Sequence, residues 1–413
     1  MRRSGRSFCL SVGLTLAACG TAGTPDNPEP VREGLAFQAE YRDLPAETED
    51  TRQNRSTVMN LQRCLPAMGD ERLGKQGVSA LAGASGGSAP SALFSERLSR
   101  GDLLDIRVAD DATFTDAYVI SRDGMLRLPF LAPIAAQGRT VEQIEDAIAG
   151  ALVDGAFYTQ PPRLSVRLRD FAPVRIAVSG AVFEPRPVDI GGTRGDEIDQ
   201  ARQSALGAAG ENRNLSVALR AAGGVRPDAD LSAVELQRDG RSYWLDMRGA
   251  ITGQSFDDVT LLTEDAVIVH SRNCFQSDLM VPSPISPPGI SLFLSNLTQP
   301  ATGNAPSAIG RDAREVPYGT RFMQAVVAAN CVGGARLTSA ARSAALFSRN
   351  PMTQDSVVIE RRIEEMRTRA DRDQYDPWLL PGDALACYDS SITNLGEAAR
   401  VVGVVGAAAL IAN

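Results

Sequence analysis

The sequence predicts an α+β fold that is divided into several small modules, and three observations indicate it. Short apolar runs that alternate with polar residues, or that end at Asp-Gly and Gly-Gly pairs, are typical of strands and hairpins. Segments with apolar residues three and four positions apart indicate a few short helices between these strands. Two stretches of the chain repeat the same order of helix, glycine pair and strand, which indicates a duplicated module.

The first segment, residues 1–18, is predicted to be a signal peptide that is removed on export. It carries three arginines and then an apolar run that is too short to span a bilayer and ends at Leu16-Ala-Ala-Cys19-Gly20. This ending resembles the bacterial lipobox, in which the cysteine is lipidated, so we expect Cys19 to carry lipid. Gly20 in place of an acidic residue favours the outer membrane. The alternative is an ordinary secretory signal in which Cys19 is incidental.

Composition limits the possible functions of the mature chain. Nearly 400 residues remain after the signal, enough for two or three domains with their own cores. The formal net charge is −8 and becomes −11 when the three arginines of the signal leave. No basic stripe with interleaved aromatic residues is present, so nucleic acid is not an expected partner. No Walker loop or dinucleotide fingerprint is present, and we expect no cofactor.

Residues 19–97 are predicted to form a tether and an N-terminal region, and residues 98–172 the first folded domain. Alternation in that domain predicts strands over residues 103–108, 118–120, 126–131 and 164–168. Asp123-Gly124 is predicted to form the hairpin corner between the second and third of these strands. A helix is predicted after Thr140, its N-cap, with Gln143 at the capping-box position. Its apolar face consists of Val141, Ile144, Ile148 and Leu152.

The repeated modules are predicted to be residues 173–275 and residues 276–390. A helix that ends at Gly223-Gly224 is echoed by Phe322 to Gly334, and Leu261 to Val269 is echoed by Leu379 to Cys387. Each copy thus combines one short helix with several strands. The charged segment from Asp355 to Asp373 is predicted to be an insertion in the second copy that forms a solvated helix.

Four cysteines remain in the mature protein besides Cys19, and an oxidising compartment favours two disulfides among them. Four cysteines allow three pairings. We expect Cys331 to pair with Cys387, because both lie in the last module, and Cys64 to pair with Cys274. No metal site is expected, because no two cysteines have zinc-ligand spacing and His270 has no second ligand beside it.

The C-terminal segment, residues 391–413, is predicted to be an apolar helix. Residues 395–412 would be roughly 27 Å long as a helix, close to the bilayer core of about 30 Å. Small residues at spacings of three and four would allow close helix packing in a membrane. These candidate packing residues are Gly396, Ala399, Gly403 and Gly406. The alternative is a helix that packs on the surface of its own protein or on a partner.

A family resemblance rests on three motifs in order: Gly101-Asp-Leu-Leu-Asp-Ile-Arg-Val108, Tyr118 to Pro129 and Gly138 to Glu145. They resemble the polysaccharide export domain of outer-membrane polysaccharide export lipoproteins. The repeated modules resemble the soluble ligand-binding β-grasp (SLBB) modules that follow this domain in that family.

The resemblance implies a homo-oligomeric ring, typically an octamer, that encloses a periplasmic cavity. Capsular polysaccharide or exopolysaccharide passes through such a ring, and the C-terminal helices form a barrel across the outer membrane. An inner-membrane polysaccharide co-polymerase is the implied partner. We therefore expect a lipid-anchored protein whose bulk lies in the periplasm. The alternative is a glycan-binding or envelope-scaffolding lipoprotein without a channel.

Enzymatic chemistry is not predicted. Gly83-Ala-Ser85-Gly-Gly matches a nucleophile elbow, but it lies in a Gly/Ser/Ala-rich linker, and His270, the single histidine, lies in a strand-like run. Three adjacent carboxylate pairs cannot flank one glycosidic bond, because neighbouring side chains diverge on a strand or a helix. These pairs are Asp110-Asp111, Asp257-Asp258 and Glu364-Glu365.

Overall fold

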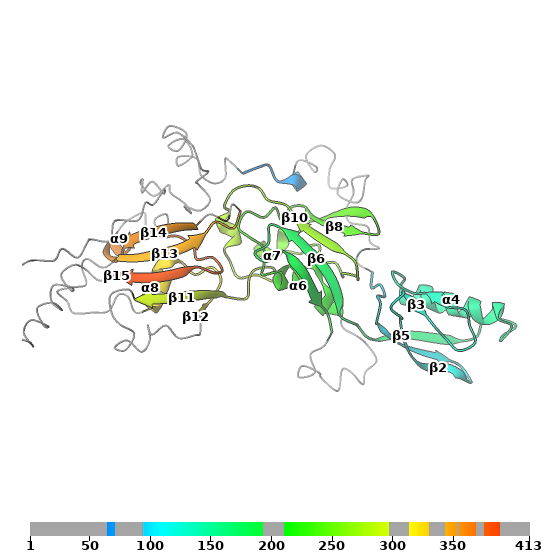
Figure 1. The fold of residues 1–413 in the computed structure, drawn as a ribbon. Helices are drawn as coiled ribbons and strands as arrows, with labels where there is room; N and C mark the ends of the chain where they lie inside the picture. The colour runs from blue at the N-terminus through cyan, green and yellow to red at the C-terminus, as the bar shows by residue number, and fades with distance from the viewer. Residues whose placement is uncertain are drawn as a thin grey trace, which may run out of the picture.

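Three large sheets, each with its own hydrophobic core, follow one another along the part of the chain that the structure describes, and a small two-stranded sheet accompanies the first. Figure 1 shows them in a row, with the first domain at the right and the last module at the left. The mixed helix and strand content agrees with the predicted α+β class. The computed structural model describes residues 64–70, 93, 95–192, 210–296, 314–329, 343–352, 354, 356–368 and 376–388.

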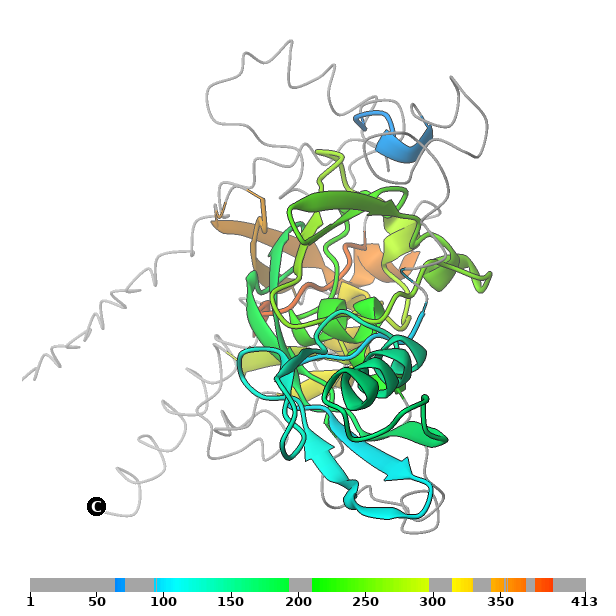
Figure 2. The same ribbon diagram turned by 90° about the vertical axis from the view of Figure 1, so that its right-hand side faces the viewer.

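The first domain is a three-stranded antiparallel sheet with one long helix on one face. Strand β1 (Leu103–Val108) lies between β2 (Asp111–Val119) and β5 (Leu164–Asp170). Alternate residues of β1, beginning at Leu104, are buried against α4 (Val141–Asp154). Figure 2 shows α4 on one side of these strands. The other face of the sheet therefore carries the intervening, more polar residues.

The predicted helix of this domain is confirmed in detail. The backbone N–H of Gln143 donates to Thr140 Oγ1 at 3.4 Å, and the backbone N–H of Thr140 donates to Gln143 Oε1 at 3.1 Å. This reciprocal capping box satisfies two of the N–H groups that a helix leaves unpaired at its start. Ile144, Ile148 and Leu152 are completely buried, as the periodicity predicts.

The predicted strand at residues 126–131 is wrong. The structure has only β3 (Met125–Leu126) there, which pairs with β4 (Ile134–Ala135) and not with the strand before the turn. Pro129 has no N–H to donate to a ladder, and Phe130 has a left-handed φ of 60°, so the chain cannot continue as a strand. The strand expected at residues 118–120 is in fact the end of the longer β2.

The two repeated modules have the same sheet topology. Their strand orders are β7-β6-β10-β8-β9 and β12-β11-β15-β13-β14, and in each the first strand in sequence runs parallel to the last. All other neighbours are antiparallel. A short helix, α6 (Leu215–Ala221) or α8 (Phe322–Ala328), follows the second strand of each module in the chain. The sequence repeat therefore corresponds to a repeated arrangement of strands.

The first module comprises β6 (Val174–Gly180), β7 (Arg186–Ile190), a 3₁₀ turn η3 (Gly210–Arg213), α6, β8 (Val234–Arg238), β9 (Arg241–Leu245), α7 (Gly249–Thr252) and β10 (Ala266–Val269). A second 3₁₀ turn, η4 (Ser277–Leu279), follows it. The second module comprises β11 (Ile290–Asn296), β12 (Arg314–Val316), α8, β13 (Ser343–Arg349), β14 (Ser356–Arg362), α9 (Ile363–Thr368) and β15 (Ala384–Tyr388). The Asp239-Gly240 pair forms the hairpin turn from β8 to β9, with φ values of 51° and 71°, as expected of an Asp-Gly pair between two strands.

The predicted insertion with a solvated helix at residues 355–373 is largely wrong. Seven residues of β14 pair with β13, so this strand is the counterpart of β9 and belongs to the repeat. This strand contains a β-branched run that includes Val358 and Ile359, and such a run favours a strand. The charged residues on both sides of the run led to the prediction of a helix. A helix, α9, follows only over Ile363–Thr368.

Candidate functional site

Among the described residues, one type of turn occurs three times, directly before β1, β10 and β15. In each, a buried aspartate closes the turn by accepting a hydrogen bond from the backbone N–H three residues earlier. The pairs are Ser99 with Asp102 at 2.7 Å, Leu262 with Asp265 at 2.7 Å, and Leu380 with Asp383 at 2.8 Å. The aspartate N–H donates back to the carbonyl of the same first residue. The carboxylate therefore fixes the start of each strand.

The third residue of every such turn has a positive φ. It is Gly101 at 86°, Glu264 at 79° and Gly382 at 89°. A turn of type II requires this conformation, which glycine adopts without steric cost. Glu264 is the exception, and its side chain forms an ion pair with Arg100 at 2.9 Å.

The first two turns meet where the first domain joins the first module. Ser99 Oγ lies 3.0 Å from Thr263 Oγ1, and the backbone N–H of Thr263 donates to Ser99 Oγ at 3.2 Å. Together with the ion pair between Arg100 and Glu264, these contacts join equivalent turns of two different sheets. The repeated turn thus serves both as a strand start and as a contact between domains.

Arg213 is the central residue of this junction. Its side chain is fully buried, and Nη1 donates to Asp102 Oδ1 at 2.8 Å. The guanidinium also lies 4.8 Å from the centre of the Phe171 ring. Burial raises the pKa of Asp102, opposed chiefly by the positive charge of Arg213, and burial lowers the pKa of Arg213. Because the two groups come from different domains, their pairing fixes how these domains are oriented.

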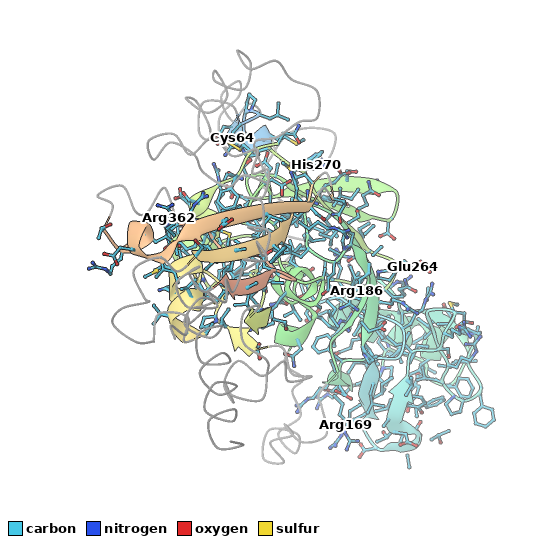
Figure 3. All side chains as sticks on the ribbon, turned by 60° about the vertical axis from the view of Figure 1, so that its left-hand side comes forward. Cys64, Arg169, Arg186, Glu264, His270 and Arg362 are labelled. Carbon is cyan, nitrogen blue, oxygen red and sulfur yellow. A yellow bond between two sulfur atoms is a disulfide. The ribbon has the colours of Figure 1, made fainter. Side chains whose placement is uncertain are left out.

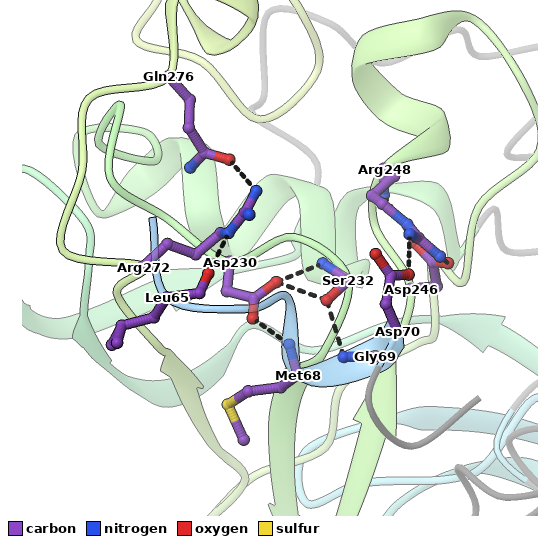
Figure 4. Close-up of polar contacts among 10 residues, drawn as sticks. All are labelled: Leu65, Met68, Gly69, Asp70, Asp230, Ser232, Asp246, Arg248, Arg272 and Gln276. Carbon is purple, nitrogen blue, oxygen red and sulfur yellow. Dashed lines mark hydrogen bonds and ion pairs between the residues drawn. The ribbon is translucent and has the colours of Figure 1, made fainter. Parts of the chain in front are cut away.

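A short N-terminal segment, residues 64–70, is held on the first module by a disulfide and several polar contacts (Figure 4). The backbone N–H of Met68 donates to Asp230 at 2.7 Å, and that of Gly69 donates to Ser232 Oγ at 2.9 Å. Asp70 forms an ion pair with Arg248 at 2.8 Å. The chain before the first domain is therefore attached to the module that follows this domain.

The disulfide joins Cys64 to Cys274, the pairing expected from the sequence. Cys387 is also disulfide-bonded. Its expected partner, Cys331, lies outside the described residues. Cys19 and the four C-terminal packing candidates, Gly396, Ala399, Gly403 and Gly406, lie outside them as well. Within the described ranges, no helix has the length and apolar character needed to cross a membrane.

The two repeated modules contact each other through both polar and aromatic groups. Arg226 Nη1 donates to the carbonyl of Pro351 at 2.9 Å. The rings of Phe183 and Tyr318 pack edge to face with centroids 6.4 Å apart. A cavity of about 540 Å³ lies beside this contact and is lined by Phe183, Arg186, Arg220, Pro287 and Pro381, among others. No motif in the sequence indicates this cavity.

The first domain carries charge of opposite sign on its two faces. On the uncovered face of the sheet, Arg107 Nε contacts Asp105 Oδ2 at 3.0 Å. Three further arginines alternate along the adjacent strand and the residue before it, are exposed, and have no carboxylate partner among the described residues. They are Arg163, Arg167 and Arg169. Figure 3 shows Arg169 at the edge of the molecule opposite Cys64.

The opposite face of the domain is the outer surface of α4. Its exposed charged residues are acidic, and the helix contains no basic residue. The acidic residues on this surface are Glu142, Asp146 and Asp154. We call the four arginines 107, 163, 167 and 169 the arginine face, and Glu142, Asp146, Gly150 and Asp154 the acidic stripe. This separation of charge is the candidate functional feature of the domain.

Residues with conceivable catalytic roles have structural partners instead. His270 Nε2 lies 3.0 Å from Glu235 Oε2, at the end of β10. Asp258 accepts hydrogen bonds from the backbone N–H and the hydroxyl of Ser216 at 2.8 and 2.7 Å, and so holds the first turn of α6. Glu364 pairs with Arg367 one helical turn away.

Two further candidates among the described residues also have structural partners. Asp111 accepts from the Tyr158 hydroxyl at 2.7 Å, and Asp257 accepts from the backbone N–H of Asp246 at 3.0 Å. Ser85 lies outside the described residues. In the part of the chain that the structure describes, no three histidine, cysteine, aspartate or glutamate residues are grouped so that they could hold a metal ion.

Two comparisons with known proteins agree with the motifs of the first domain. Residues 94–169 match the family model described as "Polysaccharide biosynthesis/export protein". The chain is similar to the EPS I polysaccharide export outer membrane protein EpsA of Ralstonia solanacearum, with 26% identity over 235 residues. That match covers 55% of this chain and 56% of the relative, so it spans little more than half of either protein. Residues 94–169, which we call the export domain, therefore match a polysaccharide biosynthesis/export model, and the predicted resemblance of this chain to polysaccharide export proteins is confirmed.

Proposed function

We propose that this chain is an outer-membrane lipoprotein that forms an oligomeric channel for export of capsular polysaccharide or exopolysaccharide across the periplasm and the outer membrane. The observation that carries the proposal is the polysaccharide biosynthesis/export domain at residues 94–169. The similarity to a polysaccharide export protein of the outer membrane supports the same role and location.

The order of the modules supports a conduit. The export domain is followed by two modules of identical sheet topology, which we propose to be SLBB modules, at residues 173–275 and 276–390. The buried pair of Arg213 and Asp102 joins the export domain to the first module. A rigid row of domains of this kind would suit a subunit that encloses a periplasmic cavity.

Two attachments to the outer membrane complete the proposal. Lipid on Cys19 would anchor each subunit, and the apolar segment at residues 391–413 would insert as a helix, packing through its small residues. The subunits would form a homo-oligomeric ring, an octamer by family resemblance, that works with an inner-membrane polysaccharide co-polymerase. Transport would be passive and non-enzymatic, and the mature chain's formal charge of −11 would disfavour tight binding of an anionic polymer.

Deletion of the gene tests the proposed function. Surface polysaccharide should be lost in the deletion strain and return with the wild-type gene, while Cys19→Ala should restore little of it. Electron microscopy of the wild-type protein extracted in detergent should show a ring. A monomeric particle together with normal export in the deletion strain would favour a glycan-binding or scaffolding lipoprotein without a channel.

A further inference from the structure

Two features of α4 are unfavourable for an isolated helix. Gly150 lies inside the helix, where glycine is about 0.5–1 kcal/mol less favourable than alanine. A Cβ atom built at Gly150 would meet nothing within 4 Å, so the fold of this chain does not require a glycine there. Asp154 lies in the last turn, where the helix dipole favours a cation, and no basic residue is present in that turn.

Both features lie on the acidic stripe. Glu142, Asp146, Gly150 and Asp154 are each four residues apart, so they lie in one row along the exposed surface of α4. The glycine removes bulk in the middle of this row, between two carboxylates. Residues that make an isolated helix less stable are expected where the surface of the helix binds a partner. The acidic stripe therefore has the features of a binding surface, with a glycine in its middle that lets another molecule come close to the helix backbone.

The arginine face offers the complementary charge. It carries four arginines, against three carboxylates on the acidic stripe. One of these arginines, Arg107, already pairs with Asp105. Beside them, Val119 is 53% exposed on the edge strand β2, which adds apolar surface. The sheet separates the two faces, so they point in opposite directions and cannot meet within one chain.

We propose that the acidic stripe of one subunit docks on the arginine face of a second copy of this chain. The contact joins two different surfaces, and such a head-to-tail contact produces a ring when the rotation between subunits closes. This inference rests on the oligomeric part of the proposed function and identifies the surface that assembles it. The charges set register and orientation, while Gly150 allows the helix backbone to approach the neighbouring sheet.

Charge exchange tests the contact. The full-length protein, extracted in mild detergent, is measured by native mass spectrometry and sedimentation at low and high salt. Arg167→Glu with Arg169→Glu should weaken association at least tenfold, and so should Asp146→Arg with Asp154→Arg. All four changes together should restore assembly, because the two surfaces are again complementary. Arg241→Glu, an exposed change on β9 of the first module, is the matched control and should assemble like wild type.

A size change at Gly150 provides a second test that does not alter charge. Gly150→Leu should leave the unfolding temperature of the monomer equal or higher, because the space around this position is open, but it should weaken assembly. Circular dichroism of each variant separates a loss of assembly from a loss of fold. A variant that unfolds is replaced by the single change at the same surface.

Three results would overturn the proposal. These are a monomeric wild type, variants that assemble like wild type, or a charge exchange that fails to restore assembly in folded protein. If the arginine variants assemble normally but lose binding to an anionic polysaccharide that the wild type retains, the arginine face contacts polymer instead. If the deletion strain loses export but the variants assemble like wild type, this interface is wrong. The proposed export function would still hold.

Discussion

Arg238 and Ser348 occupy the same position in the two repeated sheets. Each donates to the buried aspartate of the turn that begins the last strand of its module. Gln237 pairs with Ala266 and Phe347 pairs with Ala384, so the next residue in each strand is equivalent. Arg238 contacts Asp265 through Nε at 2.9 Å and Nη2 at 2.6 Å. Ser348 Oγ donates to Asp383 Oδ1 at 2.6 Å.

The same carboxylate therefore has different electrostatic surroundings in the two modules. Burial raises the pKa of Asp265, and the guanidinium of Arg238 opposes that rise. Burial raises the pKa of Asp383 to about 7, opposed only by hydrogen bonds from Leu380 and Ser348. A hydroxyl cannot replace the charge of a guanidinium, so the second module is the one whose stability should depend on pH near neutrality.

Asp383→Asn should remove a pH dependence of stability. The pKa of Asp383 is about 7 in the folded chain and near the ordinary value of 3.8 when unfolded. Between these values the folded state binds the proton more tightly, so the free energy of unfolding falls as pH rises, by up to about 1.4 kcal/mol per pH unit. Urea unfolding of the full-length protein in mild detergent between pH 4 and 8 measures this slope, and the contribution of Asp383 should be absent from the asparagine variant.

Asp265→Asn is the comparison for that experiment. It should lower stability at every pH in the same range, because it leaves the buried guanidinium of Arg238 without a countercharge. Equal pH slopes in wild type and Asp383→Asn would show that Asp383 is ionised in the folded protein at pH 4 to 8.

Arg238→Met should be strongly destabilising. The arginine and Asp265 are both almost fully buried, and Arg238 Nη2 also donates to the carbonyl of Thr260 at 2.8 Å. Removing one partner of a buried pair leaves an uncompensated charge, which costs about 3–5 kcal/mol. Denaturant unfolding measures the loss. Arg241→Met, at an exposed position in the same hairpin, should stay within about 0.5 kcal/mol of wild type, and an equal loss in both would refute the role of the pair.

The sequence predicts those parts of the fold that depend on local patterns. The capping box of Thr140 and Gln143 and the Asp239-Gly240 hairpin each follow from residues close together in the chain. The repeat is visible because both modules place Gly-Gly after a helix and an aspartate before the last strand. The strand β14 is missed because it lies at the edge of its sheet and carries charged residues, which make the segment resemble a solvated helix.

The charged surfaces and the junctions are harder to predict, because they depend on distant contacts. Arg213 lies in a polar stretch without periodicity, and its partner Asp102 is 111 residues away. The register of β1 and β5 completes the arginine face by placing Arg167 opposite Asp105, beside Arg107. The arginines at 163, 167 and 169 alternate in the sequence, and this spacing, read as one face of a strand, is the signal that would have indicated the surface.

Glu264→Gly should stabilise the protein slightly. Glu264 has a φ of 79° in the turn where the equivalent residues are Gly101 and Gly382. Relief of a left-handed conformation in a non-glycine residue is worth about 1–2 kcal/mol, whereas an exposed ion pair such as that with Arg100 contributes about 0–1 kcal/mol. The gain should therefore exceed the loss. Thermal unfolding measures the difference.

Gly382→Ala is the reciprocal change. A Cβ there would meet nothing within 4 Å, so its effect isolates the backbone conformation, and it should destabilise by about 1–2 kcal/mol. If Glu264→Gly destabilises the protein while Gly382→Ala also does, the ion pair at the junction outweighs the strain, contrary to this expectation.

Arg213→Met should loosen the junction between the export domain and the first module. Asp102 would retain the N–H donors of Ser99 and Ala172 but lose its countercharge while remaining buried, at a cost of about 3–5 kcal/mol. Hydrogen exchange should increase at Ser99 and Thr263 more than in the core of the second module. The double variant Arg213→Met with Asp102→Asn should recover part of the loss, and simple additivity of the two changes would show that they do not act as a pair.

Replacement of the cysteines tests the attachment of the N-terminal segment. Cys64→Ser with Cys274→Ser opens a covalent link between residues 210 positions apart, and native disulfides of this kind typically contribute about 2–4 kcal/mol. The amides of Met68 and Gly69, which donate to Asp230 and Ser232, should then exchange faster with solvent. Leu65→Ala, at a half-exposed position in the same segment, is the control and should leave this exchange unchanged. If the serine variant protects both amides as well as the wild type does, then Asp230, Ser232 and Arg248 hold the segment without the disulfide.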